Sequence, residues 1–182
     1  MAPAIAGPTL STIEENPDPP RFHMPLPQKT LAELAVDIAL EEVRKGVFET
    51  NNDNRGERID EYQKSANGVM AEAWCAKFVF WCFEQASARR YTKNPMPKIF
   101  AARAFELWAT RERKIVEVPE LGDVLILEHR HVGIVAGAPT STGTIPSVEG
   151  NTWARSTFQN RREGVYALQK QKISKCTFAR LV

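Results

Sequence analysis

Three cysteines and three histidines are the side chains of this sequence best suited to nucleophilic chemistry. They are Cys75, Cys82, Cys176, His23, His129 and His131. A thiol hydrolase needs a thiolate, a base that holds its proton, and a group that orients the base. Cysteine and histidine in such a site are distant in sequence and meet only in the fold. Which cysteine pairs with which histidine therefore depends on the helices and strands that carry them.

Cys75 is the cysteine best placed to be a nucleophile. It stands at the expected start of an apolar helix at residues 73–90, after the polar stretch SANGVMAEA. At a helix N-terminus, unpaired N–H groups and the helix dipole favour the thiolate. Cys82 follows two turns later in the apolar run, and Cys176 opens a candidate strand. We interpret both as small buried hydrophobic residues.

His131 is the predicted base because it opens the apolar strand VGIV, which would fix its ring. His129 falls in an expected hairpin turn and is interpreted as a solvated surface residue, and His23 lies in a proline-rich segment. The stretch SVEGNTW offers Glu149 and Asn151 to orient the imidazole, since residues two apart on a strand share a face. Glu-Gly-Asn is also typical of a turn. A carboxylate stabilises an imidazolium better than an amide does, so Glu149 is favoured as the orienting residue, and Asn151 is the alternative.

The first half of the chain is expected to form helices that position Cys75. Thr30 and Glu33 form a capping box before a helix that should end at Gly46. Three further helices are predicted, at residues 59–66, 73–90 and 99–111. Four residues of the last helix are expected to face inward: Phe100, Ala101, Phe105 and Trp108.

The second half is rich in Val and Ile and is expected to form strands. The segments 122–128 and 131–137 are separated by a tight polar turn, which is a hairpin signal. Further strands are predicted at residues 144–149, 165–169 and 176–182. Helices followed by an antiparallel sheet indicate an α+β domain.

Composition indicates one domain with an N-terminal arm. The chain has 182 residues, of which 43% are hydrophobic and 25% charged, as in soluble globular proteins. Residues 1–28 hold seven of the twelve prolines and lack helix or strand periodicity, so we predict a flexible arm before a domain at residues 29–182. Three cysteines without a Cys-x-x-Cys pair indicate neither a disulfide framework nor a zinc site, and no metal or cofactor is expected.

Charge and hydropathy limit the expected partners. The net charge of +2 gives no overall bias toward nucleic acid. Residues 150–182 carry seven Lys or Arg against one Glu, which could favour a polyanion or form a solvated strand face. The N-terminus lacks the features of a secretory signal, and no segment is long enough to span a bilayer. We therefore expect synthesis in the cytoplasm without a signal peptide, and no membrane partner.

Three blocks of the sequence together resemble a known family. WCAKFVFWC, GDVLILEHRHVGIV and SVEGNTW are similar to the cysteine, strand–histidine and polar blocks of the CHAP amidases (cysteine, histidine-dependent amidohydrolase/peptidases). That family belongs to the papain-like cell-wall hydrolases of bacteria and phages. NRGERIDEY is similar to a block that often precedes the cysteine. The resemblance covers about residues 47–170.

The resemblance implies a papain-like fold, with N-terminal helices packed on an antiparallel sheet. By its motifs Cys75 matches the nucleophile, His131 the base, and Glu149 with Asn151 the polar residues of the third block. Asp123 matches a structural aspartate. The implied activity is cleavage of a peptidoglycan amide bond through an acyl-enzyme, without a cofactor.

The biological setting implied by the resemblance is the bacterial cell wall. The protein would act there after lysis or specialised secretion, as a phage lysin, an antibacterial effector or a remodelling enzyme. We expect a monomer, with an immunity or delivery protein as partner if the protein is a secreted effector. The sequence does not say which peptidoglycan bond is cut.

Two other classes of function stay open. One is a papain-like cysteine protease or acyltransferase acting on a non-wall amide, and the other is a non-catalytic wall-binding module that retains the fold. Rapid alkylation of Cys75 below pH 7 would separate an enzyme from a binding module. The oxyanion donor is open as well: Gln63 and Tyr62 are candidates beside the backbone N–H of Cys75, but a surface or packing role is the more ordinary interpretation of each.

Overall fold

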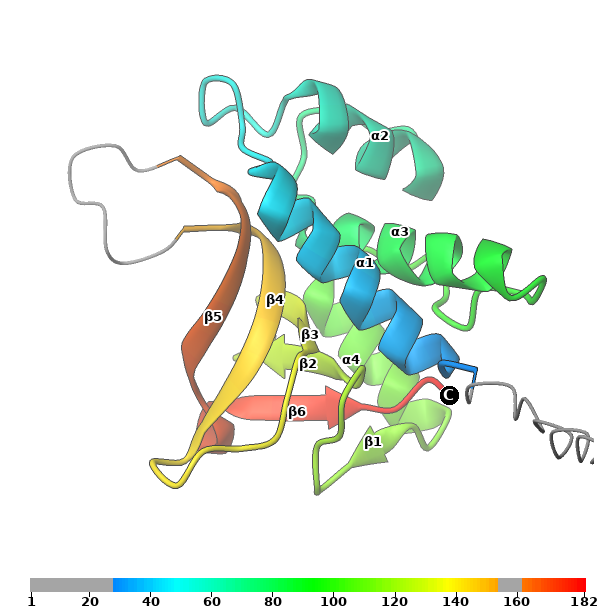
Figure 1. Ribbon diagram of the computed structural model, residues 1–182, viewed down its shortest axis with the longest axis vertical. Coiled ribbons are helices and arrows are strands. Elements are labelled where there is room, and N and C mark those ends of the chain that lie inside the picture. The colour runs from blue at the N-terminus through cyan, green and yellow to red at the C-terminus, as the bar shows by residue number, and fades with distance from the viewer. Residues whose placement is uncertain (1–27, 154–161) are drawn as a thin grey trace, which may run out of the picture.

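Four α-helices and a six-stranded antiparallel sheet make up the computed structural model, which describes residues 28–153 and 162–182. The helices are α1 (Leu31–Lys45), α2 (Glu57–Ala66), α3 (Cys75–Arg89) and α4 (Ala102–Arg111). Figure 1 shows α1, α2 and α3 to one side of the curved β4–β5 pair. The predicted α+β class is confirmed. Most of the predicted N-terminal arm, including His23, lies outside the described residues.

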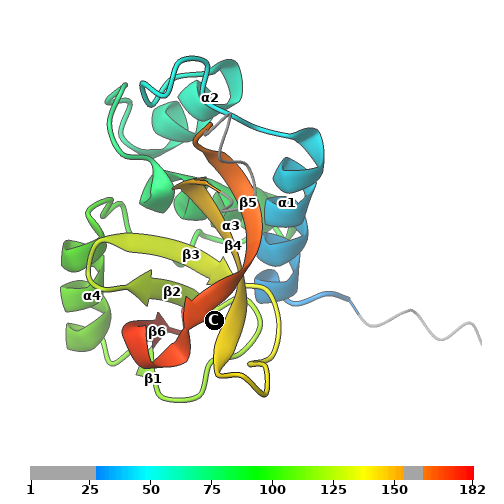
Figure 2. The same ribbon diagram turned by 90° about the vertical axis from the view of Figure 1, so that its left-hand side faces the viewer.

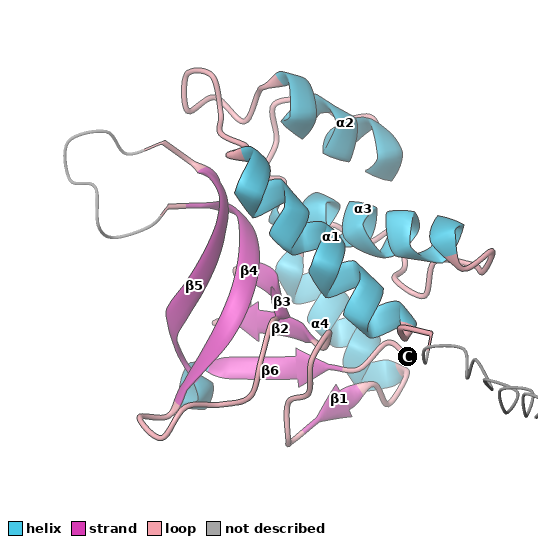
Figure 3. Cartoon of the chain, viewed as in Figure 1, coloured by secondary structure: helices cyan, strands magenta, loops and turns pink. Residues whose placement is uncertain are grey.

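The strands, magenta in Figure 3, follow the four α-helices along the chain. They are β1 (Ile115–Val116), β2 (Val124–Leu127), β3 (His131–Val135), β4 (Thr144–Thr152), β5 (Gly164–Lys172) and β6 (Cys176–Ala179), with a short 3-10 helix η1 (Ile173–Lys175) before β6. Their order in the sheet is β1-β6-β2-β3-β4-β5, and all pairs are antiparallel. The two-residue strand β1 is too short to leave a sequence pattern.

The start of the domain forms as its sequence predicts. Thr30 and Glu33 make the reciprocal capping box, which satisfies two N–H groups at the start of α1. Gly46 ends the helix in the left-handed conformation, with φ of 66°. Helix α1 then packs against α3, the helix that carries Cys75.

The inner face of α4 differs from the prediction by one residue. Ala101 has an extended backbone and precedes the helix, so the first helical residue is Ala102. Ala101 is therefore exposed, and Ala102, Phe105 and Ala109 are the buried residues. Of the other residues predicted to face inward, Phe100 and Trp108 are half-buried.

The sheet separates two hydrophobic clusters because alternate residues of a strand face opposite sides. The main core lies between the helices and the sheet and includes Val124, Val132 and Ile134. A smaller cluster on the other face contains Leu125, Val135, Ile145 and Phe178. Figure 2 shows the strong twist of the sheet, with β2 and β3 crossing the view and β5 running up it. No described helix is long and apolar enough to cross a membrane.

Strand β4 continues through Glu149 and Asn151, so the predicted turn at Glu-Gly-Asn is wrong. The register of β4 and β5 shifts between Glu149 and Thr152, and Asn151 has φ of 55°. This bulge replaces the turn, and it decides where the two polar side chains point.

Candidate active site

Cys75 is the first residue of α3, as the sequence predicts. Its side chain lies at the inner edge of the main core and is 6% exposed. The sulfur receives backbone N–H groups from Ala76, in the first turn of the helix, and from Val132 on β3. The cysteine is thus held between the start of a helix and the first residues of a strand.

Gly150 allows the start of α3 to reach the sheet. A Cβ atom at this position would lie 2.6 Å from the Trp74 ring and 2.9 Å from Cβ of Phe78. Any side chain would therefore push α3 away from β4, and Cys75 with it. The glycine of SVEGNTW serves close packing and not a turn.

His131, the first residue of β3, hydrogen-bonds to Cys75. Burial alone would raise the pKa of the thiol, but the hydrogen bond and charge of His131, together with the two backbone N–H groups, bring the pKa below its ordinary value. A thiolate is therefore favoured at Cys75. Burial raises the pKa of Cys82 well above normal, and burial with the nearby Glu149 raises that of Cys176 to about 11. Cys75 is the only one of the three cysteines whose pKa is lowered.

Glu149 lies on the other side of the imidazole. Its Oε2 is 3.0 Å from Nε2 of His131, which leaves Nδ1 for the thiol. The contact has the distance of an ion pair, but the Nε2–H does not point at a hydrogen-bond acceptor. Glu149 can approach because Gly133 has no side chain: a Cβ there would lie 2.6 Å from Cγ of Glu149. The absence of a side chain at Gly133 therefore leaves space for the Glu149 side chain to lie over β3 and reach His131.

The carboxylate of Glu149 is fully buried and held in place. Ser147 Oγ donates to its Oε1 at 2.6 Å, and Gln171 Nε2 donates to its two oxygens at 3.1 and 3.2 Å. Burial would raise the pKa of Glu149, but His131, Ser147 and Gln171 lower it, so the group is ionised. Burial would lower the pKa of His131, but its hydrogen bond to Cys75 and its ionic contact with Glu149 raise that pKa to about 10. At neutral pH His131 is an imidazolium and Glu149 is a carboxylate, and the lowered pKa of Cys75 favours its thiolate.

Asn151 takes a different position from the one predicted for an orienting residue. Its Oδ1 accepts the backbone N–H of Trp74, the residue before Cys75, at 3.0 Å. Its Nδ2 donates to Glu163, Asn54 and Glu49, at 2.8, 3.1 and 3.3 Å. The expectation that Glu149 and Asn151 share a face fails because the bulge turns Asn151 toward the start of α3.

The acceptors around Asn151 were not foreseen from the sequence. Glu49 is buried and accepts Trp74 Nε1–H at 2.8 Å and the backbone N–H of Asn54 at 2.8 Å. Burial and the neighbouring Glu49 raise the pKa of Glu163. This group fixes the backbone and ring of Trp74, and so fixes the residue before the nucleophile. The sequence signal was weak because Glu49 stands in a polar stretch typical of loops. Ser147 was also not named from the sequence, although its place two residues before Glu149 on the same strand is a signal that could have found it.

The loop before Cys75 is anchored from α2 and α3. Gln63 donates to the carbonyl of Asn54 at 2.7 Å and accepts the N–H of Glu72 at 3.3 Å. Lys77 is buried and donates to the carbonyl of Val69 at 2.8 Å and to Glu72 at 3.1 Å. The Gln63 side chain is thus engaged in holding this loop.

The remaining candidates have structural partners. Tyr62 is buried, and its hydroxyl donates to Glu42 at 2.5 Å, away from Cys75. Asp123 accepts two hydrogen bonds from Arg180, each of 3.0 Å, at the start of β2. His129 is exposed in the hairpin turn but pairs with Glu106 of α4, so it is not merely solvated. It does not belong to the Cys75 group.

A cleft of about 550 Å³ opens beside the imidazole. Its described lining comes from β2, β3, β4, β5 and η1: Leu127, His131, Glu149, Asn151, Thr152, Trp153, Gln171, Lys172 and Lys175. The cleft reaches the imidazole of His131, and Cys75 is not among its described lining residues. Within residues 28–153 and 162–182, no three His, Cys, Asp or Glu side chains converge as ligands for a metal ion.

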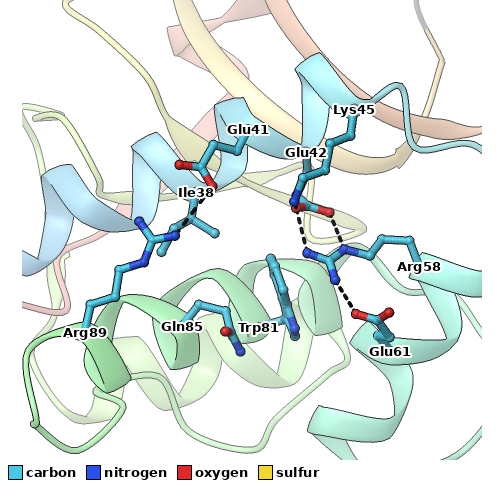
Figure 4. Close-up of a pocket in the computed structure, with 9 residues that line it drawn as sticks. All are labelled: Ile38, Glu41, Glu42, Lys45, Arg58, Glu61, Trp81, Gln85 and Arg89. Atoms are coloured by element: carbon cyan, nitrogen blue, oxygen red, sulfur yellow. Dashed lines mark hydrogen bonds and ion pairs between the residues drawn. The ribbon is translucent and has the colours of Figure 1, made fainter.

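A second concave site lies on the helices and is shown in Figure 4. There the buried carboxylate of Glu42 accepts two hydrogen bonds from Arg58, at 2.7 and 2.9 Å, and one from Lys45 at 2.8 Å. The hydroxyl of Tyr62 also donates to it. The Arg58 guanidinium also lies 4.5 Å from the centre of the Trp81 ring. This pocket holds ion pairs between helices and contains neither cysteine nor histidine.

Comparison with protein-family models, curated proteins and solved structures gives no match. The geometry around Cys75 and the resemblance of the three sequence blocks are therefore the two observations that bear on function.

Proposed function

We propose that the protein is a cysteine amidohydrolase or peptidase with a papain-like, CHAP-type fold that cuts an amide bond of bacterial peptidoglycan. The observation that carries the chemistry is the alignment of Cys75, His131 and Glu149. The groups around the site lower the pKa of the Cys75 thiol and raise the pKa of the His131 imidazole to about 10. Such opposite shifts on adjacent groups are typical of nucleophilic sites.

The reaction begins with the ion pair already formed. The Cys75 thiolate attacks the amide carbonyl carbon, a C–S bond forms, and the carbonyl π electrons move to oxygen. His131 then gives its Nδ1 proton to the nitrogen as the C–N bond breaks, and the amine leaves. Water, deprotonated by the now neutral imidazole, attacks the thioester, which restores the thiol and releases the acid.

The surrounding residues position the reacting groups in this mechanism. Glu149 stabilises the imidazolium and fixes the ring, and Ser147 and Gln171 hold the carboxylate. Asn151 holds Trp74, and hence the start of α3 and the backbone N–H of Cys75. That N–H is the proposed donor to the oxyanion. The side chains of Tyr62 and Gln63 already donate hydrogen bonds to Glu42 and to the carbonyl of Asn54, which argues against either of them in that role.

Peptidoglycan as the substrate is supported by the family resemblance, and the amide bond by the thiol chemistry. An acyl-enzyme requires a carbonyl, whereas glycosidic cleavage uses paired carboxylates at an acetal. Purified peptidoglycan treated with the protein should be solubilised and should gain amine ends without new reducing sugar ends. Mass spectrometry of the fragments would identify the bond.

Cys75 alkylation divides the alternatives. If Cys75 reacts rapidly below pH 7 while intact wall, stem peptides and cross-linked fragments all stay uncut, the enzyme acts on a non-wall amide. If Cys75 reacts at the slow rate of an ordinary thiol, a non-catalytic module becomes the better explanation.

A further inference from the structure

The cleft beside His131 is lined by two cations whose positive charge the proposed reaction does not use. Lys172 ends β5 and Lys175 ends η1, and both are exposed. Glu149 is the one acid among the described lining residues. Its carboxylate is buried and directed at His131. The charge that a substrate meets along this wall is therefore positive.

The two lysines differ in how they are engaged. Lys175 donates to Glu128 at 2.7 Å, but both side chains are more than half exposed, and such surface pairs are weak. Lys172 has no ion pair within the described part of the chain. An incoming anion can therefore contact Lys172 directly and can compete with Glu128 for Lys175.

The charge of the reacting groups gives these lysines a role with an anionic substrate. When Cys75 is a thiolate, it carries with the imidazolium and the carboxylate a net charge of −1. A substrate that bears a carboxylate near its scissile amide would be repelled by that charge. Lys172 and Lys175 on the same cleft wall offset it.

We propose that this cleft selects acidic peptides, with Lys172 and Lys175 holding a substrate carboxylate beside the amide that Cys75 attacks. The inference rests on the proposed function and names the chemistry of its substrate. The lysines are specificity-determining residues and take no part in bond breaking.

The cleft charge can be measured without cutting any substrate. Iodoacetate and iodoacetamide alkylate the same thiolate, but only iodoacetate carries a negative charge. Each rate is followed at Cys75 by peptide mass spectrometry, in the full chain, at pH 7 and low ionic strength. In water, one unit charge acting across about 10 Å changes such a rate about twofold, and we take this as the expected size of each lysine's effect. The iodoacetate-to-iodoacetamide ratio should therefore fall about twofold in Lys172→Met, about twofold in Lys175→Met and about fourfold in the double variant.

Lys93→Met is the matched control, because Lys93 is exposed beyond the far end of α3 and its loss changes the net charge equally. Its ratio should equal that of the unchanged protein. Near 1 M salt, where the screening length is about 3 Å, all the ratios should converge.

The outcomes separate the two proposals. Rapid alkylation by both reagents with a ratio that the cleft variants do not lower, or that Lys93→Met lowers equally, would overturn the acidic-substrate inference and leave the ion pair intact. Slow alkylation by both reagents would overturn the proposed enzyme itself. As a second readout, the double variant should lose kcat/KM on an acidic stem peptide but keep it on the same peptide with amidated carboxylates. Equal losses on both peptides would also overturn the inference.

Discussion

Two buried glutamates, Glu42 and Glu149, have similar surroundings and different uses. Each is fully buried and accepts hydrogen bonds from several side chains, and the pKa of each is lowered. Glu42 is bound by Arg58 and Lys45, whereas the ionic partner of Glu149 is His131. A shifted carboxylate pKa therefore does not by itself distinguish a structural ion pair from a reactive one.

The difference lies in what the cationic partner can do. Arg58 keeps its proton at any ordinary pH, so the cluster in Figure 4 can only hold α1, α2 and α3 together. An imidazole can release its proton, and His131 also touches a thiol whose pKa is lowered. We therefore expect changes at Glu42 to affect stability and changes at the Cys75 group to affect chemistry.

The largest expected effect is the loss of all hydrolysis in Cys75→Ala. The thiol has no substitute, because the pKa values of Cys82 and Cys176 are raised and neither contacts His131. Turnover and thermal unfolding should be measured together, and the folded state should persist. Cys82→Ala is the matched control, with lower stability from the buried cavity but retained turnover. An active Cys75→Ala protein, or an inactive but folded Cys82→Ala protein, would show that the nucleophile is wrong.

The next effect is the loss of the base. His131→Ala should reduce kcat about 100- to 10,000-fold, because Cys75 loses the group that lowers its pKa and the leaving amine loses its proton donor. His129→Ala should retain nearly normal activity, since its pairing with Glu106 links the hairpin to α4 and not to the thiol. A larger kinetic loss in the His129 variant would exchange the two assignments.

Sequence patterns predicted the helices and most strands because caps, hydrophobic period and glycine signals are local. They could also bring Cys75 and His131 together, since each stands at the start of a rigid element. The charge of Glu149 favoured it as the orienting residue, but the position of Asn151 could not be predicted, because it depends on a one-residue bulge in β4. Gly133 and Gly150 were visible in the sequence, but their meaning depends on which elements approach them. Glu49 and Glu163 join Asn151 only through long-range contacts.

Substituting each of the two glutamates tests whether Glu149 acts on the chemistry and Glu42 on stability. Glu149→Gln should reduce kcat about 10- to 100-fold, the effect of losing a charged interaction of about 1.5–3 kcal/mol. Removing the negative charge destabilises the imidazolium, so the pKa of His131 should fall from about 10. The alkaline limb of the activity profile should therefore move to lower pH.

Glu42→Gln should leave kcat unchanged and lower the free energy of unfolding by about 2–3 kcal/mol. This is less than for a wholly buried pair, because Arg58 and Lys45 reach solvent. The pKa of Glu42 is lowered from 4.5 to about 2, so its stabilisation is present above pH 5 and is lost as pH falls toward 2. Denaturant unfolding at several pH values should show this loss in the unchanged protein and not in Glu42→Gln. If Glu42→Gln instead shifted the pH profile of activity, the two clusters would not be separable.

The smallest expected effect is that of Asn151→Ala. This change removes the acceptor for the Trp74 N–H and one donor to Glu49 and Glu163, which loosens the start of α3. Loss of such a hydrogen bond costs about 1 kcal/mol of stability, and we expect a severalfold lower kcat with the alkaline limb of the pH profile unmoved.

The unmoved limb distinguishes this variant from Glu149→Gln, since Asn151 makes no contact with the imidazole among its hydrogen bonds. Activity and the pH dependence of Cys75 alkylation should be compared in both variants under the same conditions. A crippled Asn151→Ala enzyme whose alkaline limb has shifted, beside a Glu149→Gln enzyme with an unchanged profile, would reverse the roles. Asn151 would then be the residue that orients His131, which would require a different arrangement of the β4 bulge during catalysis.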